Sequence, residues 1–537
     1  MNTLPRRFPN VTRWALIGGA VALAWLNRFV QDDAFISFRY AQNLAQGHGL
    51  VYNIGERVEG YTNFLWTVCM TPAFVFGMDV VTWSYCLSLL VFVVTLSVSA
   101  KLAHAMWGDA RASLIVIVLL ATNYSFSCYA TGGLETQFGI AWLMLSVWLL
   151  HANRLVPAAL CSACAVMTRM DAALILFPFW FAVVWGAVRH RKAMGSLASA
   201  LALGTIPVLA WVLWRHHYYG AWLPNTFLIK GHGLNLLRGF YYVSFFYAIY
   251  ALWLVIPLCG AKWHPFMRQP TGLCIVISAI AWTLYVTAVG GDFMEFRLMM
   301  PTLPFVMIFV GGVITETIRR GNQTIGAGVL AAMVLVSLLH GTMKWNYPCM
   351  SSISELKGQH RDWRTLADAF NAVFGDAPDV KIGITCAGII PFYTQRPALD
   401  LMGLNDRDVA LAGEAVEPLK WVGNRPGHIR MATWGMTLEK EVNLLINNPW
   451  VVDPQSHVLA WDAQKIVSHW FFGEGANPER VYASGIRLPS SGAPIPPVIA
   501  WPLSDGRYWL MAYLKPHPAV DDAIRRVGAK LILPVNE

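Results

Sequence analysis

Charged side chains are scarce in this chain of 537 residues, since Asp, Glu, Lys and Arg together make up only 13% of it. Soluble domains carry about 25% charged residues. Hydrophobic residues reach 56% of the chain instead. This composition excludes a soluble, disordered or collagen-like protein, and it predicts that most of the chain lies in a lipid bilayer.

Several familiar motifs are also missing. The sequence contains no P-loop, no glycine fingerprint of a dinucleotide-binding fold, no internal repeat and no low-complexity tract. Without a polar face rich in Lys and Arg, it has no expected surface for nucleic acid. Cys161 and Cys164 lie in an apolar run, where cysteines behave as small hydrophobic residues rather than as a zinc or redox site. Cys349 and Cys386 lie in the polar part of the chain, and a disulfide between them is left open.

Long apolar runs fill the first 340 residues. A helix that crosses a bilayer needs about 20 mostly apolar residues. Twelve segments pass this first test: 13–30, 61–78, 83–103, 112–130, 134–151, 155–168, 172–188, 195–214, 240–260, 271–290, 299–318 and 324–340. Pro72 interrupts the aromatic segment 61–78, so we expect that segment to lie along the membrane interface and about eleven spanning helices to remain.

The distribution of positive charge indicates how these helices are oriented. If 61–78 does not span, the basic connections of the bundle all fall on one side, which the positive-inside rule assigns to the cytoplasm. That side holds 13 basic residues and only two acidic ones, Asp109 and Glu316. The first apolar run continues to Val30 without a cleavage site, so we expect a retained span rather than a signal peptide. An odd number of spans then places the chain after residue 340 on the outer side.

The polar part of the chain begins at residue 341. It contains 19 basic and 20 acidic residues, whereas residues 1–340 contain 21 and 11. Its pattern predicts an amphipathic helix over Asp362–Phe374 and short strands over Val380–Cys386 and Pro397–Met402. We therefore expect a membrane domain of residues 1–340, with a first outer loop over about 31–82, and an outer α/β domain of residues 341–537.

The carboxylates of the membrane domain gather on the outer side. Asp32 and Asp33 begin the first outer loop, and Asp33 is expected to cap a helix from Ala34 to about Gln46. An apolar stripe on this helix predicts that it lies along the membrane interface, with Arg39 on another face. Further ionisable residues on this side are Glu135, Arg169, Asp171, Lys230, Asp292, Glu295 and Arg297. Ionisable groups near membrane depth are costly and often functional.

These residue types suit the transfer of a group from a lipid-borne donor to an acceptor at the membrane edge. A carboxylate can accept the proton of an attacking hydroxyl. Lys230 and Arg297 can neutralise a phosphate leaving group. Alternatively, two or three carboxylates can hold a divalent cation such as Mg, Mn or Ca. Because no nucleotide-binding motif is present, we expect a lipid phosphate to carry the transferred group.

Seven motifs follow one another between residues 32 and 428: DDAFISFRYAQNLAQGHGLVYNIGERVEGYTNFLW, GGLET, TRMDAA, LPNTFLIKG, GGDFMEFR, DLMGLNDRD and RPGH. Together they resemble the bacterial GT-C glycosyltransferases related to the mycobacterial terminal arabinofuranosyltransferases and to Gram-negative pilin arabinosyltransferases. The resemblance implies a polytopic α-helical protein of the bacterial inner membrane with a C-terminal extracytoplasmic α/β domain. It also implies transfer of a sugar, with arabinofuranose expected, from a polyprenyl-phosphate donor to a surface glycan or pilin at the periplasmic face.

The same resemblance implies roles for residues in the matching motifs. It makes Asp32 the catalytic carboxylate, with Asp33 second. The residues expected to bind the phosphate or sugar of the donor are Arg39, His48, Asn63, Glu135, Arg169, Asp171, Asn225, Lys230, Asp292 and Arg297. In the outer domain the matching polar residues are Asp400, Asp406 and His428, which serve either the acceptor or the structure alone.

Two other functions stay open on the sequence. A transporter or flippase for a polyprenyl-linked sugar would need polar residues at mid-membrane and two related halves, and neither is visible. A glycan-binding protein that uses the bundle as an anchor would need one span rather than about eleven. The donor sugar, the acceptor, the stereochemical outcome, the metal requirement and the oligomeric state are not determined by these patterns.

Overall fold

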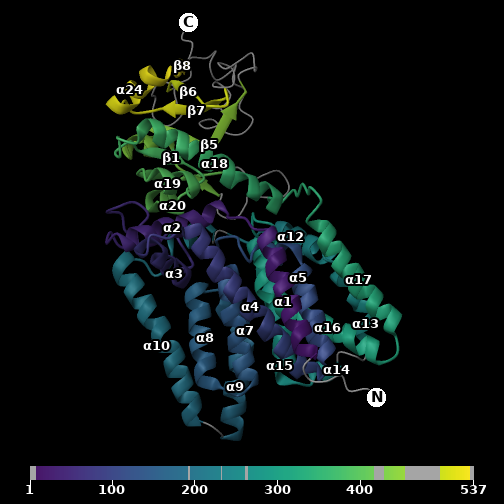
Figure 1. Ribbon diagram of the computed structural model, residues 1–537. Helices are drawn as coiled ribbons and strands as arrows, with labels where there is room; N and C mark the ends of the chain where they lie inside the picture. The colour runs from purple at the N-terminus through teal and green to yellow at the C-terminus, as the bar shows by residue number, and fades with distance from the viewer. Residues whose placement is uncertain are drawn as a thin grey trace.

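The computed structural model describes residues 8–191, 194–230, 233–260, 264–416, 429–453 and 496–532. The helices of the first 340 residues form a long bundle, and the strands gather at one end of it (Figure 1). Helix α24 (Pro518–Val527) lies at the end of the molecule farthest from the bundle. The membrane part and the polar part of the sequence are therefore stacked end to end.

The bundle helices coincide with the apolar runs of the sequence. Six segments are long and apolar enough to cross a membrane: α4 (Val80–Trp107), α9 (Ala172–His190), α10 (Met194–Tyr219), α15 (Pro270–Val289), η3 with α16 (Arg297–Arg319) and α17 (Gln323–His340). A seventh candidate is α12 (Leu236–Ile249) together with the following helical segment Leu252–Cys259, from which it is bent by 63°.

Shorter apolar helices complete the bundle. They are α1 (Phe8–Leu26), α3 (Phe64–Val75), α5 (Ala110–Thr122), α7 (Thr136–His151) and α8 (Leu155–Thr168). Helix α3 has 12 residues, which corresponds to about 18 Å and is too short for a hydrocarbon core of about 30 Å. The described residues therefore supply six candidate spans, or seven if the bent pair counts as one. The expected number of about eleven would also need α1, α5, α7 and α8, of which α5 and α8 have only 13 and 14 residues, so it stays a prediction.

Helix α2 (Asp32–Ala45) lies between the bundle and the strands (Figure 1). The predicted cap at Asp33 is wrong, because Gln31 is the N-cap and its side chain accepts the N–H of Asp33. The expected polar face is also wrong, since Arg39 and Asn43 are buried. The physical reason is that the carbonyls of Pro391 and Arg396 cover Arg39 from the C-terminal part of the chain, and those of Val51 and Tyr52 cover Asn43 from the first outer loop.

One buried apolar core connects the two parts of the molecule. It runs from the bundle through Phe35 and Phe38 of α2 to Ile389 and Phe392 of α19 (Ile389–Thr394). Phe35 and Phe392 are in ring contact, with centroids 5.3 Å apart. Because the core is continuous, no polar layer separates α19 from α2 and the bundle.

The strands form one mixed sheet of six with the order β2-β1-β5-β7-β6-β8, and β3 (Glu414–Ala415) pairs separately with β4 (Arg430–Met431). The members of the large sheet are β1 (Ile382–Ile384), β2 (Ala398–Asp400), β5 (Leu444–Val452), β6 (Val498–Pro502), β7 (Tyr508–Tyr513) and β8 (Lys530–Ile532). Strand β1 pairs in parallel with β2 and β5, and the other pairs are antiparallel. The two predicted strands are confirmed as β1 and β2.

Helix α18 (Ile353–Phe374) leads from the bundle to this sheet. It contains the predicted amphipathic helix 362–374 and begins nine residues earlier, at Ile353. The earlier start has a local cause: Ser352 and Glu355 form a reciprocal capping box.

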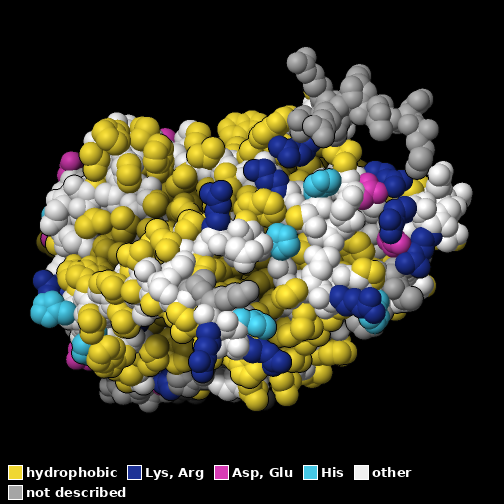
Figure 2. All heavy atoms as spheres, turned by 90° about the horizontal axis from the view of Figure 1, so that it is seen from below, with side chains coloured by type: hydrophobic (Ala, Val, Ile, Leu, Met, Phe, Trp, Pro, Cys, Tyr) yellow, Lys and Arg dark blue, Asp and Glu magenta, His cyan; other side chains and the backbone are white. Residues whose placement is uncertain are grey.

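The basic connections lie at the end of the bundle away from the sheet. Arg111 stands at the start of α5, Arg154 at the start of α8, and Arg319 at the end of α16. Figure 2 shows this face, where Lys and Arg side chains lie among hydrophobic ones and few acidic side chains are visible. The charge asymmetry on which the predicted orientation depends is therefore present in the folded chain.

Candidate active site

Asp33 occupies the first turn of α2, at the end of the bundle that faces the sheet. Its carboxylate forms no hydrogen bond or ion pair with any residue that the structure describes. The charges that act on it belong to Lys230, Arg297, Asp292 and Glu135, so motifs from three distant parts of the sequence meet around it. Burial raises the pKa of Asp33 more than Lys230 and Arg297 lower it. Asp33 is thus an unpaired carboxylate beside two cations.

These two cations keep free hydrogen-bond donors. Lys230 ends α11 (Asn225–Lys230), its side chain is exposed, and its amine has no partner among the described residues. Arg297 donates from Nε to Asp292 Oδ2 at 2.6 Å. No described residue binds its two terminal nitrogens. Lys230 and Arg297 can therefore both bind an anion next to Asp33.

Arg169 holds the remaining carboxylates of this cluster. Its Nη1 binds Glu135 at 3.0 Å, and its Nε binds Asp171 at 3.0 Å, with a second contact from Nη2 to the same carboxylate. Asn63 donates to the other oxygen of Glu135 at 3.0 Å. Burial opposes ionisation of Glu135, but Arg169 and Arg297 hold its pKa below the usual value. Asn63 thus positions Glu135 rather than presenting a free group to a ligand.

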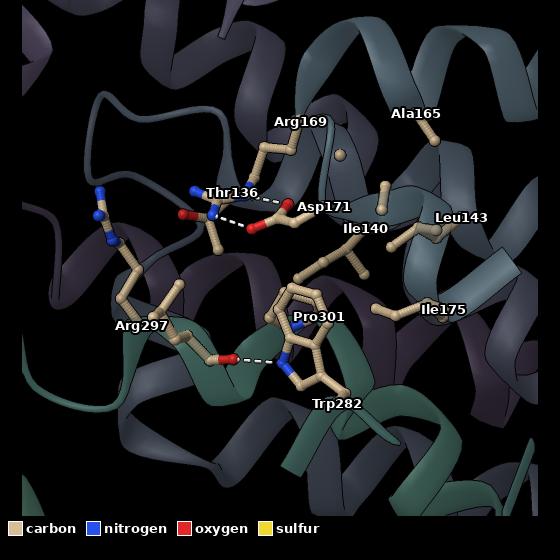
Figure 3. Close-up of a pocket in the computed structure, with 13 residues that line it drawn as sticks. Thr136, Ile140, Leu143, Ala165, Arg169, Asp171, Ile175, Trp282, Arg297 and Pro301 are labelled. Carbon is tan, nitrogen blue, oxygen red and sulfur yellow. Dashed lines mark hydrogen bonds and ion pairs between the residues drawn. The ribbon is translucent and has the colours of Figure 1, made fainter. Parts of the chain in front are cut away.

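A narrow cleft leads from the arginines into the bundle, between α7, α8, α9, α15 and η3 (Arg297–Thr302). Figure 3 shows the polar ends of Arg169, Asp171 and Arg297 on one side of it, with Leu143 and Ile175 on the other. Its remaining lining is mainly apolar and includes Ile140, Leu298, Pro301 and Trp282, whose indole donates to the carbonyl of Leu298. The cleft is therefore charged at one end and apolar along its length.

Asp32 faces a different partner from its neighbour. Its two carboxylate oxygens accept two backbone N–H groups: that of Ile389, the first residue of α19, at 2.7 Å, and that of Gly388, just before it, at 3.2 Å. Burial raises its pKa to about 7 despite these two bonds. A Cβ on Gly388 would lie 1.9 Å from the carbonyl oxygen of Asp32, so only glycine allows this approach. Asp32 therefore connects the start of α19 to α2 by two hydrogen bonds. No local sequence signal pointed to the role of Gly388.

Arg39 is occupied by oxygen atoms of the protein itself. Its guanidinium donates to the carbonyls of Tyr52 (2.8 Å), Pro391 (3.0 Å) and Arg396 (2.7 Å) and to the side chain of Asn53 (3.2 Å). The side chain is buried. Arg39 was expected to bind the donor, whereas in the structure it joins the first outer loop to α19 and the residues after it.

Two further candidates for donor binding lie outside the cluster. His48 is exposed on the turn after α2. Asn225 donates from its amide to the carbonyls of Gly403 and Leu404 at 2.6 and 3.1 Å, and so connects α11 to the turn after β2. Asn225 therefore has a structural contact. Among the described residues, His48 has no contact with the charged groups around Asp33.

The polar residues of the outer motifs have local structural partners. Asp400 accepts from the backbone N–H groups of Met402 and Asn405 at 3.0 and 2.9 Å, and Asp406 caps α20 (Arg407–Ala412). His428 lies outside the described residues. Of the two alternatives that the sequence left for these motifs, turn and cap chemistry accounts for both described aspartates.

The cysteines of the polar part do not pair. No disulfide joins Cys349 and Cys386. Cys349 is buried near Arg238, whereas burial raises the pKa of Cys386, which lies near Asp32. The disulfide that the sequence left open is absent from the structure.

The carboxylates of the cluster do not fit a divalent cation. Within the described ranges, no group of three or more His, Cys, Asp or Glu side chains is placed to hold a metal. Arg169 binds Glu135 and Asp171, and Arg297 binds Asp292. A divalent cation would have to displace these arginines, so Lys230 and Arg297 are the groups suited to neutralise an anion here.

Comparison with known sequences finds relatives that match a little over half of the chain. A terminal beta-(1->2)-arabinofuranosyltransferase of Corynebacterium glutamicum is 30% identical over 366 residues, covering 59% of this chain and 53% of that protein. Its namesake in Mycobacterium tuberculosis is 28% identical over 365 residues, covering 58% and 57%. GPI alpha-1,2-mannosyltransferase 3 of Mus musculus is 25% identical over 317 residues, covering 54% and 57%. The chain thus spans about half the length of these curated relatives, and the predicted resemblance is confirmed.

Comparison with solved structures settles the fold class. ArnT from Cupriavidus metallidurans bound to undecaprenyl phosphate aligns with a TM-score of 0.54 at 12% identity, covering 93% of this chain and 97% of that one. The same protein in the apo state gives a TM-score of 0.54 at 13% identity, covering 94% and 98%. A family model described as a domain of unknown function (DUF8728) matches residues 354–480. The predicted GT-C fold with a strand-containing C-terminal part is confirmed.

Proposed function

We propose that this chain is a membrane glycosyltransferase that moves a sugar, arabinofuranose in the first instance, from a polyprenyl-phosphate donor to an acceptor hydroxyl. One observation carries the proposal: the unpaired carboxylate of Asp33 lies within the electrostatic reach of two cations, Lys230 and Arg297, each of which keeps donors that no described residue binds. The similarity to terminal arabinofuranosyltransferases and to the fold of ArnT supports the reaction class.

Asp33 is the base in this proposal, and the predicted order of the two aspartates is reversed. Both oxygens of Asp32 accept backbone N–H groups, whereas Asp33 has no partner among the described residues. A base must reach the proton that it removes. The raised pKa of Asp33 brings its proton affinity closer to that needed near neutral pH. Asp32 positions Asp33 by holding the first turn of α2 against Gly388.

The reaction transfers one proton and exchanges one bond. Asp33 takes the proton of the acceptor hydroxyl while the oxygen of that hydroxyl bonds to the anomeric carbon of the sugar. The bond from that carbon to the phosphate oxygen breaks, and its electron pair stays on the phosphate. Lys230 and Arg297 neutralise the charge that develops there, because a low-dielectric site strengthens these interactions. The products are a glycosylated acceptor and a polyprenyl phosphate.

The cleft between α7, α9 and α15 suits the lipid part of such a donor. A phosphate at Arg297 would place the adjoining prenyl chain at the apolar lining, next to Ile140 and Trp282. Burial of apolar chain against this lining is favourable by about 25 cal/mol per Å². The charged and apolar ends of the cleft thus match the polarity of an amphipathic donor, and because the cleft encloses only about 20 Å³, its walls would have to move apart to admit a prenyl chain.

The orientation completes the proposal. With the basic connections on the cytoplasmic side, Asp33 and the sheet lie on the periplasmic side of a bacterial inner membrane. The acceptor is then a surface glycan or, more narrowly, a pilin. Both present hydroxyl groups on that side.

The test uses the purified full chain in detergent with a polyprenyl-phosphoryl pentose. Lys230→Ala should raise the donor KM by at least about tenfold, because one phosphate contact is worth about 1.5–3 kcal/mol, and Lys230→Arg should restore part of it. Lys344→Ala changes an exposed lysine after α17 and is the control. Binding of the donor without any transfer would favour the transporter, and equal donor KM values in all variants would remove Lys230 from the site.

A further inference from the structure

A second cavity, of about 330 Å³, opens on the other side of α11. Its walls come from the first outer loop, the end of α10, α11 and the start of α20. Asn225 and Leu228, one helical turn apart, contribute from α11. Lys230 follows two residues later and so lies about 200° around the helix from Leu228. The cavity is therefore separate from the cluster around Asp33, and the proposed reaction does not use it.

Two unpaired arginines give this cavity a positive charge. Arg57 and Arg407 line it, are exposed, and form no ion pair within 4.0 Å in the described part of the chain. Arg57 lies against the ring of Tyr218, with 4.7 Å from its guanidinium carbon to the ring centroid. The one carboxylate in the wall, Glu59, is bound by buried Arg215 at 2.8 Å. Two guanidinium groups are thus free for an anion, and phosphate fits their planar fork.

The position of the cavity points to a lipid as the source of that phosphate. Helix α10 is a candidate span that ends at Tyr219, and the cavity begins at that residue, with α20 beyond the same end of the helix (Figure 1). Trp222 and Leu223 follow on its rim, with 59% and 45% of their surface exposed. Trp is enriched at the level of lipid headgroups. The cavity therefore opens where the apolar part of α10 ends, which is the headgroup layer.

We propose that this cavity binds the phosphate of a membrane lipid, at a site distinct from that of Lys230 and Arg297. Arg57 and Arg407 hold the phosphate, and Trp222 and Leu223 contact the apolar part of the lipid. An anionic phospholipid of the surrounding membrane and a polyprenyl phosphate share this chemistry. The proposal depends on the placement of α10 in a membrane and does not depend on sugar transfer.

The experiment measures lipid binding to the purified full chain by native mass spectrometry, without a sugar donor. Phosphatidylglycerol, undecaprenyl phosphate, phosphatidylcholine and inorganic phosphate are the probes. An Arg57→Gln, Arg407→Gln double variant should bind phosphatidylglycerol or undecaprenyl phosphate at least tenfold more weakly, and the probe that shows the loss identifies the source. The control is an Arg361→Gln, Arg525→Gln double variant, which changes two exposed arginines of α18 and α24.

A third variant separates lipid from soluble anion. Trp222→Ala keeps both arginines and should still weaken lipid binding, while the melting temperature shows that each variant is folded. Equal affinity of the double variant and the control for both anionic lipids would overturn the proposal. An arginine-dependent loss that appears with inorganic phosphate alone would also overturn it, because the site would then take a soluble anion. Neither result bears on transfer at Asp33, so the two proposals fail separately.

Discussion

Replacing Asp33 with Asn tests the assignment of the base, because Asn keeps the shape of the side chain and removes its ability to take a proton. A positioned general base contributes about 10²–10⁴-fold to the rate, which corresponds to about 3–5 kcal/mol of the activation barrier. Asp33 has no hydrogen bond to lose among the described residues. We therefore expect Asp33→Asn to lower kcat by this factor while protein level, melting temperature and donor KM stay close to those of the unchanged chain.

Asp32→Asn is the matched variant, since it makes the same chemical change one residue earlier. In the unchanged chain Asp32 accepts the N–H of Ile389 at 2.7 Å and that of Gly388 at 3.2 Å. Asn keeps one oxygen as an acceptor for Ile389 and loses the acceptor for Gly388. A lost hydrogen bond to a charged group costs about 1.5–3 kcal/mol, and part of this is offset because a neutral side chain is less costly to bury. We expect a loss of kcat below about tenfold.

The assay is steady-state transfer of a radiolabelled pentose by each variant in detergent, with kcat and donor KM determined separately. A large loss of kcat in Asp33→Asn together with a small one in Asp32→Asn fits the geometry. The reverse order, with an inactive Asp32→Asn and a nearly normal Asp33→Asn, would refute the argument from unpaired and paired carboxylates.

Three further results should follow from the same contacts. Since burial raises the pKa of Asp32 from 3.8 to about 7, the protonated side chain stabilises the fold fully below about pH 4, and this contribution is lost as the pH rises through about 7. The melting temperature of Asp32→Asn should therefore fall less steeply than that of the unchanged chain between about pH 4 and 7, and parallel curves would contradict the shift. Gly388→Ala places a Cβ 1.9 Å from a backbone oxygen and should impair transfer at a normal protein level. The control Gly358→Ala, whose Cβ meets no atom within 4 Å, should not impair it. Equal activity of the two variants would show that the close approach of Gly388 to Asp32 is not needed. Treatment with EDTA should leave transfer unchanged, because Lys230 and Arg297 supply the positive charge; a loss that Mg²⁺ restores would show that the site takes a metal after all.

The fold was largely predictable from the sequence because its main signal is local. Each apolar run of about 20 residues specifies a helix by itself, and all twelve runs that we identified are mainly helical in the structure. Two of them are interrupted: 112–130 is divided into α5 and a short helix Tyr124–Cys128, and 240–260 is bent by 63° after Ile249. Short strands such as 380–386 were also found, because a buried run between turns is visible over a few residues.

The sequence predicted on which side of the membrane the charged motifs lie, but it did not predict which of their side chains come together. Charge distribution placed Asp33, Lys230 and Arg297 on one face, and the structure brings them together. The division of roles between Asp32 and Asp33 could not be read, because the partner of Asp32 lies 356 residues away. The partners of Arg39 could not be read for the same reason: two of its acceptors, Pro391 and Arg396, come from the other end of the chain.

The most direct measurement of sugar transfer by this chain uses a strain that lacks it. The sugars of its surface polymers and pili are released and identified by mass and linkage, before and after complementation. The account predicts that one terminal pentose disappears in the deletion strain and returns with the unchanged chain but not with Asp33→Asn at an equal membrane level. Identical sugars in the deletion and complemented strains, or full restoration by Asp33→Asn, would contradict it.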